Sequence, residues 1–216
     1  MVPDRNEHML TNGPQNGLCT IVLAHGAGAP MDSDFMTIVA ERLAEHGFRV
    51  VRFEFPYMAL RRQTGKKRPP DGEPVMRKTW LDVIGSLGPS EKTIIGGKSM
   101  GGRIASLIAD EAQVAGLVCL GYPFHPTGKP DKLRTEHLKS LATPTLILQG
   151  ERDPFGRHEE VVGYALPRCL KIQWLPDGDH SFKPRKSSGL TLDGNLALAI
   201  ASVAKFAKRV IESKPR

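Results

Sequence analysis

The chain has 216 residues, of which 40% are apolar and 25% are charged, a composition typical of a globular protein in water. It contains no run of about 18 apolar residues, which excludes a membrane-spanning helix, and its first residues lack the apolar core of a secretory signal. Its three cysteines, an odd number, lie in or beside apolar stretches, which favours reduced and mostly buried thiols. We therefore expect one cytoplasmic domain over residues 1–216, with residues 1–18 as a peripheral N-terminal segment.

The positive charge of the chain is concentrated in one stretch. Lysine and arginine number 30 against 23 acidic residues, which gives a formal net charge of +7. Seven basic and two acidic side chains fall within residues 61–78, which we expect to form an exposed basic loop. No zinc-finger spacing, aromatic RNA-binding motif or leucine zipper accompanies this charge, so nucleic acid is not an expected partner. If the loop borders an active site, it would attract an anionic substrate, and salt would weaken the attraction.

Short runs of apolar and β-branched residues alternate with helical patterns along the chain. In chain order, we predict a strand over 20–24, a helix over 35–46, a strand over 49–53, a helix over 75–87, a strand over 92–95, a helix over 100–112, strands over 115–120, 145–148 and 170–175, and a helix over 195–211. The strands are almost continuously apolar, which is typical of a parallel sheet buried on both faces. The alternation predicts an α/β fold with a mostly parallel central sheet flanked by helices. In such folds, functional residues gather just after the carboxyl ends of the strands.

The third predicted strand leads into a G-x-S-x-G motif formed by Gly97, Ser99 and Gly101. A serine on so sharp a strand-to-helix turn adopts a strained backbone conformation, and larger side chains two residues away on either side would collide. The serine then stands at the amino end of the next helix, where N–H groups stabilise a developing negative charge. The sequence therefore predicts Ser99 as a nucleophile, and a simple glycine-rich turn is the alternative.

The same stretch also contains Gly-Lys-Ser (97–99), which ends the phosphate-binding loops of nucleotide triphosphatases. Such a loop requires a glycine five residues before Gly97, and Lys92 stands there. The glycines near residue 26 likewise fail the dinucleotide-binding pattern, because Met31 occupies the position of the third glycine. We expect neither an organic cofactor nor a metal.

An acidic residue and a histidine follow the last two predicted strands. Asp153 comes after the first of these strands, and His180 comes after the second. The order serine, acid, histidine is the order in which α/β-hydrolases carry their catalytic triad. We predict Asp153 as the acid and His180 as the base. Glu151 is the main alternative acid and His158 a minor alternative base, and the alternative role of His180 is to cap its Asp-Gly-Asp turn.

The first predicted strand ends in the run HGAG (25–28), through which the main chain can approach the nucleophile. We predict that the N–H groups of Ala27 and Met100 form the oxyanion hole. His25 is expected to hold this loop in place rather than to transfer protons.

Four motifs together resemble a known family. The stretches HGAGAP (25–30), GKSMGG (97–102), LQGERDPFG (148–156) and DGDHSF (177–182) are similar to those of small, dienelactone-hydrolase-like α/β-hydrolases. One subgroup is closer, through RFEFPYM, KKRPPDGEP, GGKSMGGR and LGYPFHPTGKP. It contains bacterial proteins of about this length and the hydrolase-like domain of a non-catalytic subunit of an animal histone-acetyltransferase complex. The resemblance runs from about residue 19 to about residue 182 and implies an α/β-hydrolase fold with Ser99 as nucleophile, Asp153 as acid and His180 as base.

The segment over 121–144 bears on the substrate. It is too short for the lid that many α/β-hydrolases insert there, so we expect an open site for a small, water-soluble substrate. Tyr122, Phe124 and His125 leave the end of the preceding strand, and Tyr57 follows another strand end. We predict that these four residues line the substrate pocket, and the alternative is that nearby prolines merely stiffen surface loops around them.

The sequence as a whole predicts a serine hydrolase that cleaves a carboxylic ester or thioester in two steps through an acyl-enzyme. The alternative, suggested by the animal relative, is a binding or scaffold module that keeps the hydrolase fold but turns nothing over.

Overall fold

The computed structural model describes residues 9–213, so the expectation for residues 1–8 lies outside the described part of the chain. Its centre is a seven-stranded sheet in the order β1-β3-β2-β4-β5-β6-β7. The strands are β1 (Met9–Asn12), β2 (Thr20–Ala24), β3 (Arg49–Phe53), β4 (Thr93–Lys98), β5 (Gly116–Leu120), β6 (Thr145–Gly150) and β7 (Leu170–Leu175). Only β1 pairs antiparallel, with β3, and every other pairing in this sheet is parallel. The predicted α/β fold with a mostly parallel sheet is therefore confirmed.

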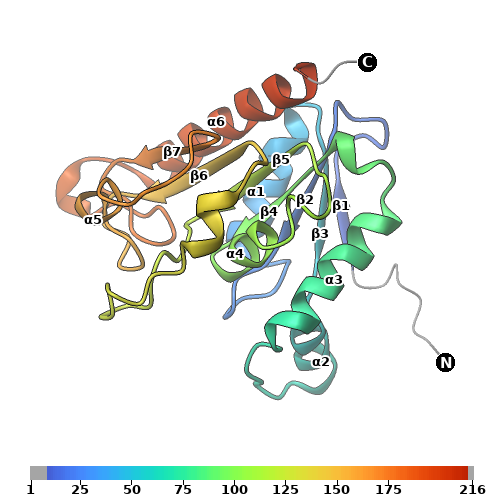
Figure 1. Ribbon diagram of the computed structural model, residues 1–216, viewed down its shortest axis with the longest axis horizontal. Coiled ribbons are helices and arrows are strands. Elements are labelled where there is room, and N and C mark those ends of the chain that lie inside the picture. Colours follow the sequence, from blue (N-terminus) through green and yellow to red (C-terminus); the bar gives the residue numbers. More distant parts are fainter. Residues whose placement is uncertain (1–8, 214–216) are drawn as a thin grey trace.

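Helices cover both faces of this sheet (Figure 1). Helices α1 (Asp34–Glu45) and α6 (Leu192–Glu212) pack on one face, and α3 (Glu73–Ser86) and α4 (Met100–Ser106) pack on the other. The remaining helical elements are α2 (Pro56–Thr64), α5 (His158–Val161) and the 3-10 turns η2 (Ser90–Lys92), η3 (Glu136–Ser140) and η4 (Lys186–Ser188). Over residues 9–213, no helix is long and apolar enough to cross a membrane.

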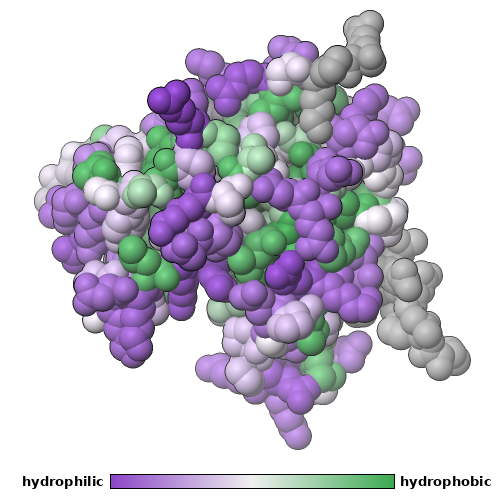
Figure 2. Space-filling model, viewed as in Figure 1, coloured by the Kyte–Doolittle hydropathy of each residue, from purple (hydrophilic) through white to green (hydrophobic). Residues whose placement is uncertain are grey.

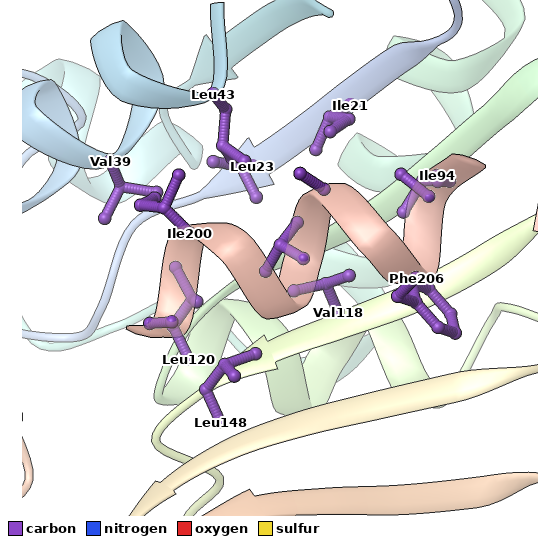
Figure 3. Packing of buried hydrophobic residues seen from close by; sticks show 14 of the residues in the cluster. Ile21, Leu23, Val39, Leu43, Ile94, Val118, Leu120, Leu148, Ile200 and Phe206 are labelled. Atoms are coloured by element: carbon purple, nitrogen blue, oxygen red, sulfur yellow. The ribbon is translucent and has the colours of Figure 1, made fainter. Parts of the chain in front are cut away.

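The core consists of two apolar layers, one on each face of the sheet. Figure 3 shows the layer under α6, in which side chains of α1, α6 and four strands point toward one another. Its labelled members are Ile21, Leu23, Val39, Leu43, Ile94, Val118, Leu120, Leu148, Ile200 and Phe206. Full burial of one such side chain stabilises a fold by about 1.5–3 kcal/mol. The face drawn in Figure 2 is mostly hydrophilic, with its hydrophobic residues in scattered patches.

This architecture brings distant parts of the chain to one edge of the sheet. Because β2 to β7 run parallel, their carboxyl ends lie along the same edge. The loops that leave β2, β4, β6 and β7 there carry the HGAG run, Ser99, Asp153 and His180. The rigid strands thus fix the starting points of all four loops.

The strongly apolar strands agree best with the sequence analysis. The predicted bounds of β2, β3 and β7 are those of the structure. The helix predicted over 100–112 is shorter, because α4 ends at Ser106 and turns continue to Gln113, whose φ is 52°. The cysteines agree with expectation: all three are free, and Cys19 and Cys119 are buried while Cys169 is partly buried.

The N-terminal segment and the basic stretch differ from expectation. Residues 9–12 form β1 and belong to the sheet rather than to a peripheral segment. Residues 61–78 are not one loop, because their first part ends α2, residues 65–72 form a connection, and the rest begins α3. Helix α2 starts with Pro56, whose fixed φ suits the first helical position, and ends at Gly65 in the left-handed conformation.

Candidate active site

Ser99 lies on the turn between β4 and α4. Its φ of 51° and ψ of −114° fall outside the regions that residues with a side chain normally occupy, a strain that costs about 1–3 kcal/mol. The Ser99 N–H donates to the main-chain oxygen of Leu120, on β5, at 3.0 Å. Met100 is the first residue of α4, so its N–H has no acceptor within the helix. The turn therefore presents a strained serine beside a helix N-terminus.

Close backbone packing explains the glycines of the motif. A methyl group added at Gly97 would lie 2.2 Å from the main-chain oxygen of Ala24, and one added at Gly101 would lie 2.5 Å from the same atom. Real Cβ atoms do not approach other atoms so closely. The two glycines are thus required because the turn packs against the end of β2, and not only by crowding across the turn itself.

Asp153 and His180 meet at the carboxyl edge of the sheet, where loops after β6 and β7 carry them. The His180 Nδ1 atom lies 2.7 Å from Oδ2 of Asp153. Because a carboxylate only accepts hydrogen bonds, Nδ1 carries the proton and Nε2 remains able to accept one. The Asp153 side chain is completely buried, whereas 22% of the His180 side chain is exposed. One end of this pair is therefore fixed in the interior and the other reaches solvent.

Gln149, the fifth residue of β6, holds the carboxylate in place. Its amide nitrogen donates to Asp153 Oδ2 at 3.0 Å, and the Phe155 N–H donates to Oδ1 at 2.9 Å. The amide oxygen of Gln149 accepts from the N–H of Tyr122 at 2.8 Å. The sequence analysis did not identify Gln149, although a single glutamine in an otherwise apolar strand was the available signal.

The alternative acid and base lie elsewhere. The Glu151 carboxylate accepts the N–H of Asp177 at 2.8 Å and so joins the two loops. The His158 ring packs edge-on against Trp174, with 4.6 Å between ring centres. Neither residue contacts the Asp153–His180 pair through a hydrogen bond in the described structure.

His25 fixes the loop over residues 25–28, which carries Ala27 and which we call the oxyanion loop. Its Nδ1 lies 2.7 Å from the carbonyl oxygen of Gly26, and its Nε2 accepts the Phe55 N–H at 3.1 Å. A carbonyl cannot donate, so the ring is neutral with its proton on Nδ1. The N–H of Ala27 is trans to the carbonyl that His25 holds and therefore points away from it. Burial lowers the pKa of His25, which favours this neutral form. The expected structural role of His25 agrees with these contacts.

Tyr57 also acts on this loop rather than offering an exposed pocket wall. Only 3% of the residue is exposed, and its hydroxyl donates to the carbonyl oxygen of Ala27 at 3.0 Å. Burial raises the pKa of this phenol, which keeps the hydroxyl protonated as a donor. Tyr57 was expected to line the substrate pocket, but it lies buried behind this loop.

The three residues expected after β5 are buried as well. Gly121, whose φ is 71°, turns the chain inward, so that Tyr122, Phe124 and His125 are each at most 2% exposed. The Tyr122 hydroxyl donates to the carbonyl oxygen of Arg134, and the Phe124 ring packs on Tyr122. These side chains were expected to line the substrate pocket. They lie in the interior instead and offer a substrate no open surface.

Ser99 and His180 are brought to the same edge but are not joined. Within residues 9–213, the Ser99 hydroxyl makes no hydrogen bond to the imidazole. Catalytic hydrogen bonds of this kind are often long without substrate and tighten when it binds.

Comparison with known proteins identifies the family of this chain. A family model described as an alpha/beta hydrolase domain matches residues 18–208. The chain belongs to this family. The dienelactone-hydrolase-like subgroup within the hydrolases stays a prediction from the motifs.

Several solved structures have the same fold as this chain over almost its whole length. A lidless α/β serine hydrolase from Xanthomonas campestris is 17% identical, with a TM-score of 0.69 over 96% of this chain and 90% of that one. Est1E from Butyrivibrio proteoclasticus, also solved with ferulic acid bound, is 15% identical, with a TM-score of 0.68 over 95% and 94%. A monoacylglycerol lipase from Paleococcus ferrophilus is 16% identical, with a TM-score of 0.64 over 90% and 98%.

Proposed function

We propose that this protein is a serine hydrolase that cleaves a small, water-soluble carboxylic ester or thioester. The observation that carries the proposal is the Asp153–His180 pair at 2.7 Å, at the same sheet edge as a serine in strained backbone geometry. A buried carboxylate that fixes the tautomer of a partly exposed imidazole is the arrangement that turns histidine into a base toward a serine.

The mechanism has two acyl-transfer steps. His180 Nε2 takes the proton of Ser99 as the hydroxyl attacks the substrate carbonyl, and Asp153 stabilises the imidazolium that forms. The N–H groups of Ala27 and Met100 hold the oxyanion. The protonated His180 then donates to the departing alcohol or thiol, and water, activated by the same imidazole, releases the acid from Ser99. No cofactor takes part in these steps.

Two features favour a small, soluble acyl group. The connection over 121–144 contains one short 3-10 turn, η3, and leaves no room for a lipase-type lid. Among the neighbours with this fold, Est1E binds ferulic acid, a soluble aromatic acid. In addition, the guanidinium of Arg61 donates to the carbonyl oxygen of Gly28 at 3.4 Å. The basic helix α2 therefore lies against the oxyanion loop, where it would attract an anionic substrate.

The first test is labelling by a fluorophosphonate probe, which reacts with activated serines. We expect rapid labelling of the wild type and none of Ser99→Ala. Ser181→Ala, at an exposed serine beside His180, is the matched control and should label like the wild type. A folded wild-type protein that resists the probe would overturn the proposal and favour the binding-module alternative.

A substrate panel then defines the ester. We expect turnover of p-nitrophenyl acetate, methyl ferulate and an acyl thioester, with loss of at least about 10³-fold in kcat for Ser99→Ala. If α2 attracts anionic substrates, kcat/KM for an acidic ester should fall with ionic strength while a neutral ester is unaffected. A rate on acidic esters that ignores salt would contradict that part of the proposal.

A further inference from the structure

The residue before the predicted nucleophile makes an unusual contact. Lys98 is the last residue of β4 and is partly buried. Its ammonium group points toward the loop that carries His180. Its Nζ donates to the main-chain oxygen of His180 at 2.6 Å. A charged donor makes a hydrogen bond about twice as strong as a neutral one. In the sequence, this lysine stands out only as part of a possible phosphate-binding loop.

The lysine side chain crosses the site between three loops. A methyl group added at Gly26, in the predicted oxyanion loop, would lie 3.5 Å from Lys98 Cγ. One added at Gly121, after β5, would lie 3.0 Å from Lys98 Nζ. The ammonium group lies 5.6 Å from the centre of the Phe35 ring on α1. Lys98 therefore links the end of β4 to the loops after β2, β5 and β7.

We propose that Lys98 is a positioning residue for the reaction, because its ammonium group holds the main chain of His180 where the imidazole can reach Ser99. The proposal rests on the proposed serine-hydrolase function. Lys98 touches neither substrate nor reacting atoms in this scheme and acts only through His180. The Asp153 contact fixes the ring of His180 from one side, and the lysine fixes its backbone. Other contacts hold this loop on either side of His180, at Asp177 and Phe182, but the lysine bonds the main chain of His180 itself.

Charge makes this anchor sensitive to pH. Burial lowers the pKa of the Lys98 ammonium to about 8, against the carboxylates of Asp153 and Asp179, which raise it. These two carboxylates, on the loops after β6 and β7, are the charged groups that act on the ammonium. Phe35 on α1 is apolar, and His25 in the loop after β2 is held neutral. Below pH 8 the donor is charged, and above it the hydrogen bond to His180 becomes an ordinary neutral one.

The experiment measures the rate of fluorophosphonate labelling from pH 6 to pH 10 in four proteins. These are the wild type, Lys98→Met, Lys98→Arg and the control Lys92→Met, at an exposed lysine just before the other end of the same strand. Methionine keeps the shape of the stem without the charge, and arginine keeps a charge over the whole range. The free energy of unfolding is measured for each, so that lost rate can be separated from lost stability.

We expect a wild-type rate that declines above pH 8. Lys98→Met should label about 10- to 100-fold more slowly at pH 7, the loss that a misplaced catalytic group causes, and should lack the decline above pH 8. Lys98→Arg should recover part of the rate and keep it to pH 10, while Lys92→Met should match the wild type. A merely structural lysine would lower stability without moving the pH profile.

Three results would overturn this inference without touching the proposed function. The first is a folded Lys98→Met that labels at the wild-type rate, and the second is a folded Lys98→Met that shows the same decline above pH 8. The third is an identical decline in wild type and Lys98→Arg, which decides the matter even if Lys98→Met does not fold. A wild type that is never labelled is a different result, because it removes the proposed function itself.

Discussion

The two halves of the candidate site are held by different kinds of contact. The turn around Ser99 is fixed by main-chain atoms: Gly97 and Gly101 pack against the oxygen of Ala24, and the Ser99 N–H bonds to Leu120. The loop around Asp153, by contrast, is fixed by side chains, because Gln149 bonds the carboxylate and His180 bonds it from the other side.

This difference determines which changes each half should tolerate. Backbone packing leaves no space around residues 97–101, the turn that we call the elbow. The stability of the elbow should therefore respond to added side-chain volume and not to a change in polarity. A hydrogen-bonded carboxylate depends on donors, so the Asp153 half should respond to a lost donor or acceptor even when the volume is unchanged.

The largest expected effect comes from Asp153→Asn. Oδ1 accepts one N–H, from Phe155, and Oδ2 accepts donors from both Gln149 and His180. An amide NH₂ must therefore face at least one donor, and in either orientation the negative charge that stabilises the His180 imidazolium is lost. We expect kcat to fall by about 10⁴-fold with little change in shape. Glu151→Gln, at the alternative acid, is the control in ester-hydrolysis kinetics and should lose less than tenfold. A larger loss for Glu151→Gln would reverse the assignment.

Gly101→Ala tests the backbone-held half. The added methyl would lie 2.5 Å from the Ala24 oxygen and 2.6 Å from the His25 oxygen. We expect overpacking to lower the free energy of unfolding by about 3 kcal/mol, measured by urea denaturation. Gly85→Ala is the matched control, because Gly85 also lies in a helix but has open space around it. There the gain in helix propensity should stabilise by about 0.5–1 kcal/mol. Equal effects at the two glycines would contradict the packing argument.

Gln149→Met makes the complementary change, with similar volume but no donor or acceptor. Asp153 loses one hydrogen bond, and the buried N–H of Tyr122 loses its acceptor. We expect a loss of about 3 kcal/mol in the free energy of unfolding, since each unsatisfied buried group costs about 1–3 kcal/mol, and about a tenfold loss in kcat. The control is Gln173→Met on β7, which is partly exposed and should change stability by less than about 0.5 kcal/mol. Wild-type activity in Gln149→Met would show that Asp153 needs no support from β6.

The sequence indicated the backbone-held half far better than the other. Runs of apolar residues bounded β2, β3 and β7, and the glycines around Ser99 marked the elbow, because backbone geometry restricts which residues fit. Gln149 and Lys98 went unrecognised, because a polar side chain at a strand end carries no periodic signal. In addition, Lys98 bonds His180 and Gln149 bonds Tyr122, partners that lie far away in sequence.

Other differences from expectation have a local cause. Strand β1 is a short edge strand without an apolar run, so it resembles a loop in sequence. Tyr57 and Tyr122 were expected to line the substrate pocket because each follows a strand end. Their rings instead enter the core, where each hydroxyl finds a carbonyl oxygen. An aromatic residue with a polar tip can satisfy either environment, and only the fold decides between them.

The smallest expected effect sharpens the comparison, because one side chain does support the backbone-held half. His25 must stay neutral, since its Nε2 accepts the Phe55 N–H, and burial lowers its pKa in the folded protein. Below about pH 6.5, the unfolded chain therefore binds a proton that the folded chain does not. The free energy of unfolding should fall as the pH drops below 6.5, until the pH reaches the lowered pKa. His137, whose pKa burial also lowers, contributes in the same direction.

Urea denaturation at pH 7.5, 6.5 and 5.5 measures this dependence. His25→Asn can keep a donor toward the Gly26 oxygen but is too short to reach the Phe55 N–H, and it does not titrate. It should therefore lower the free energy of unfolding at all three pH values and flatten the slope between pH 6.5 and 5.5. The exposed His46→Asn is the control and should leave the slope unchanged. If His25→Asn retained the full wild-type slope, the oxyanion loop would not depend on a neutral His25. The elbow and its neighbouring loop would then be fixed by main-chain packing and by the side chains of Tyr57 and Arg61.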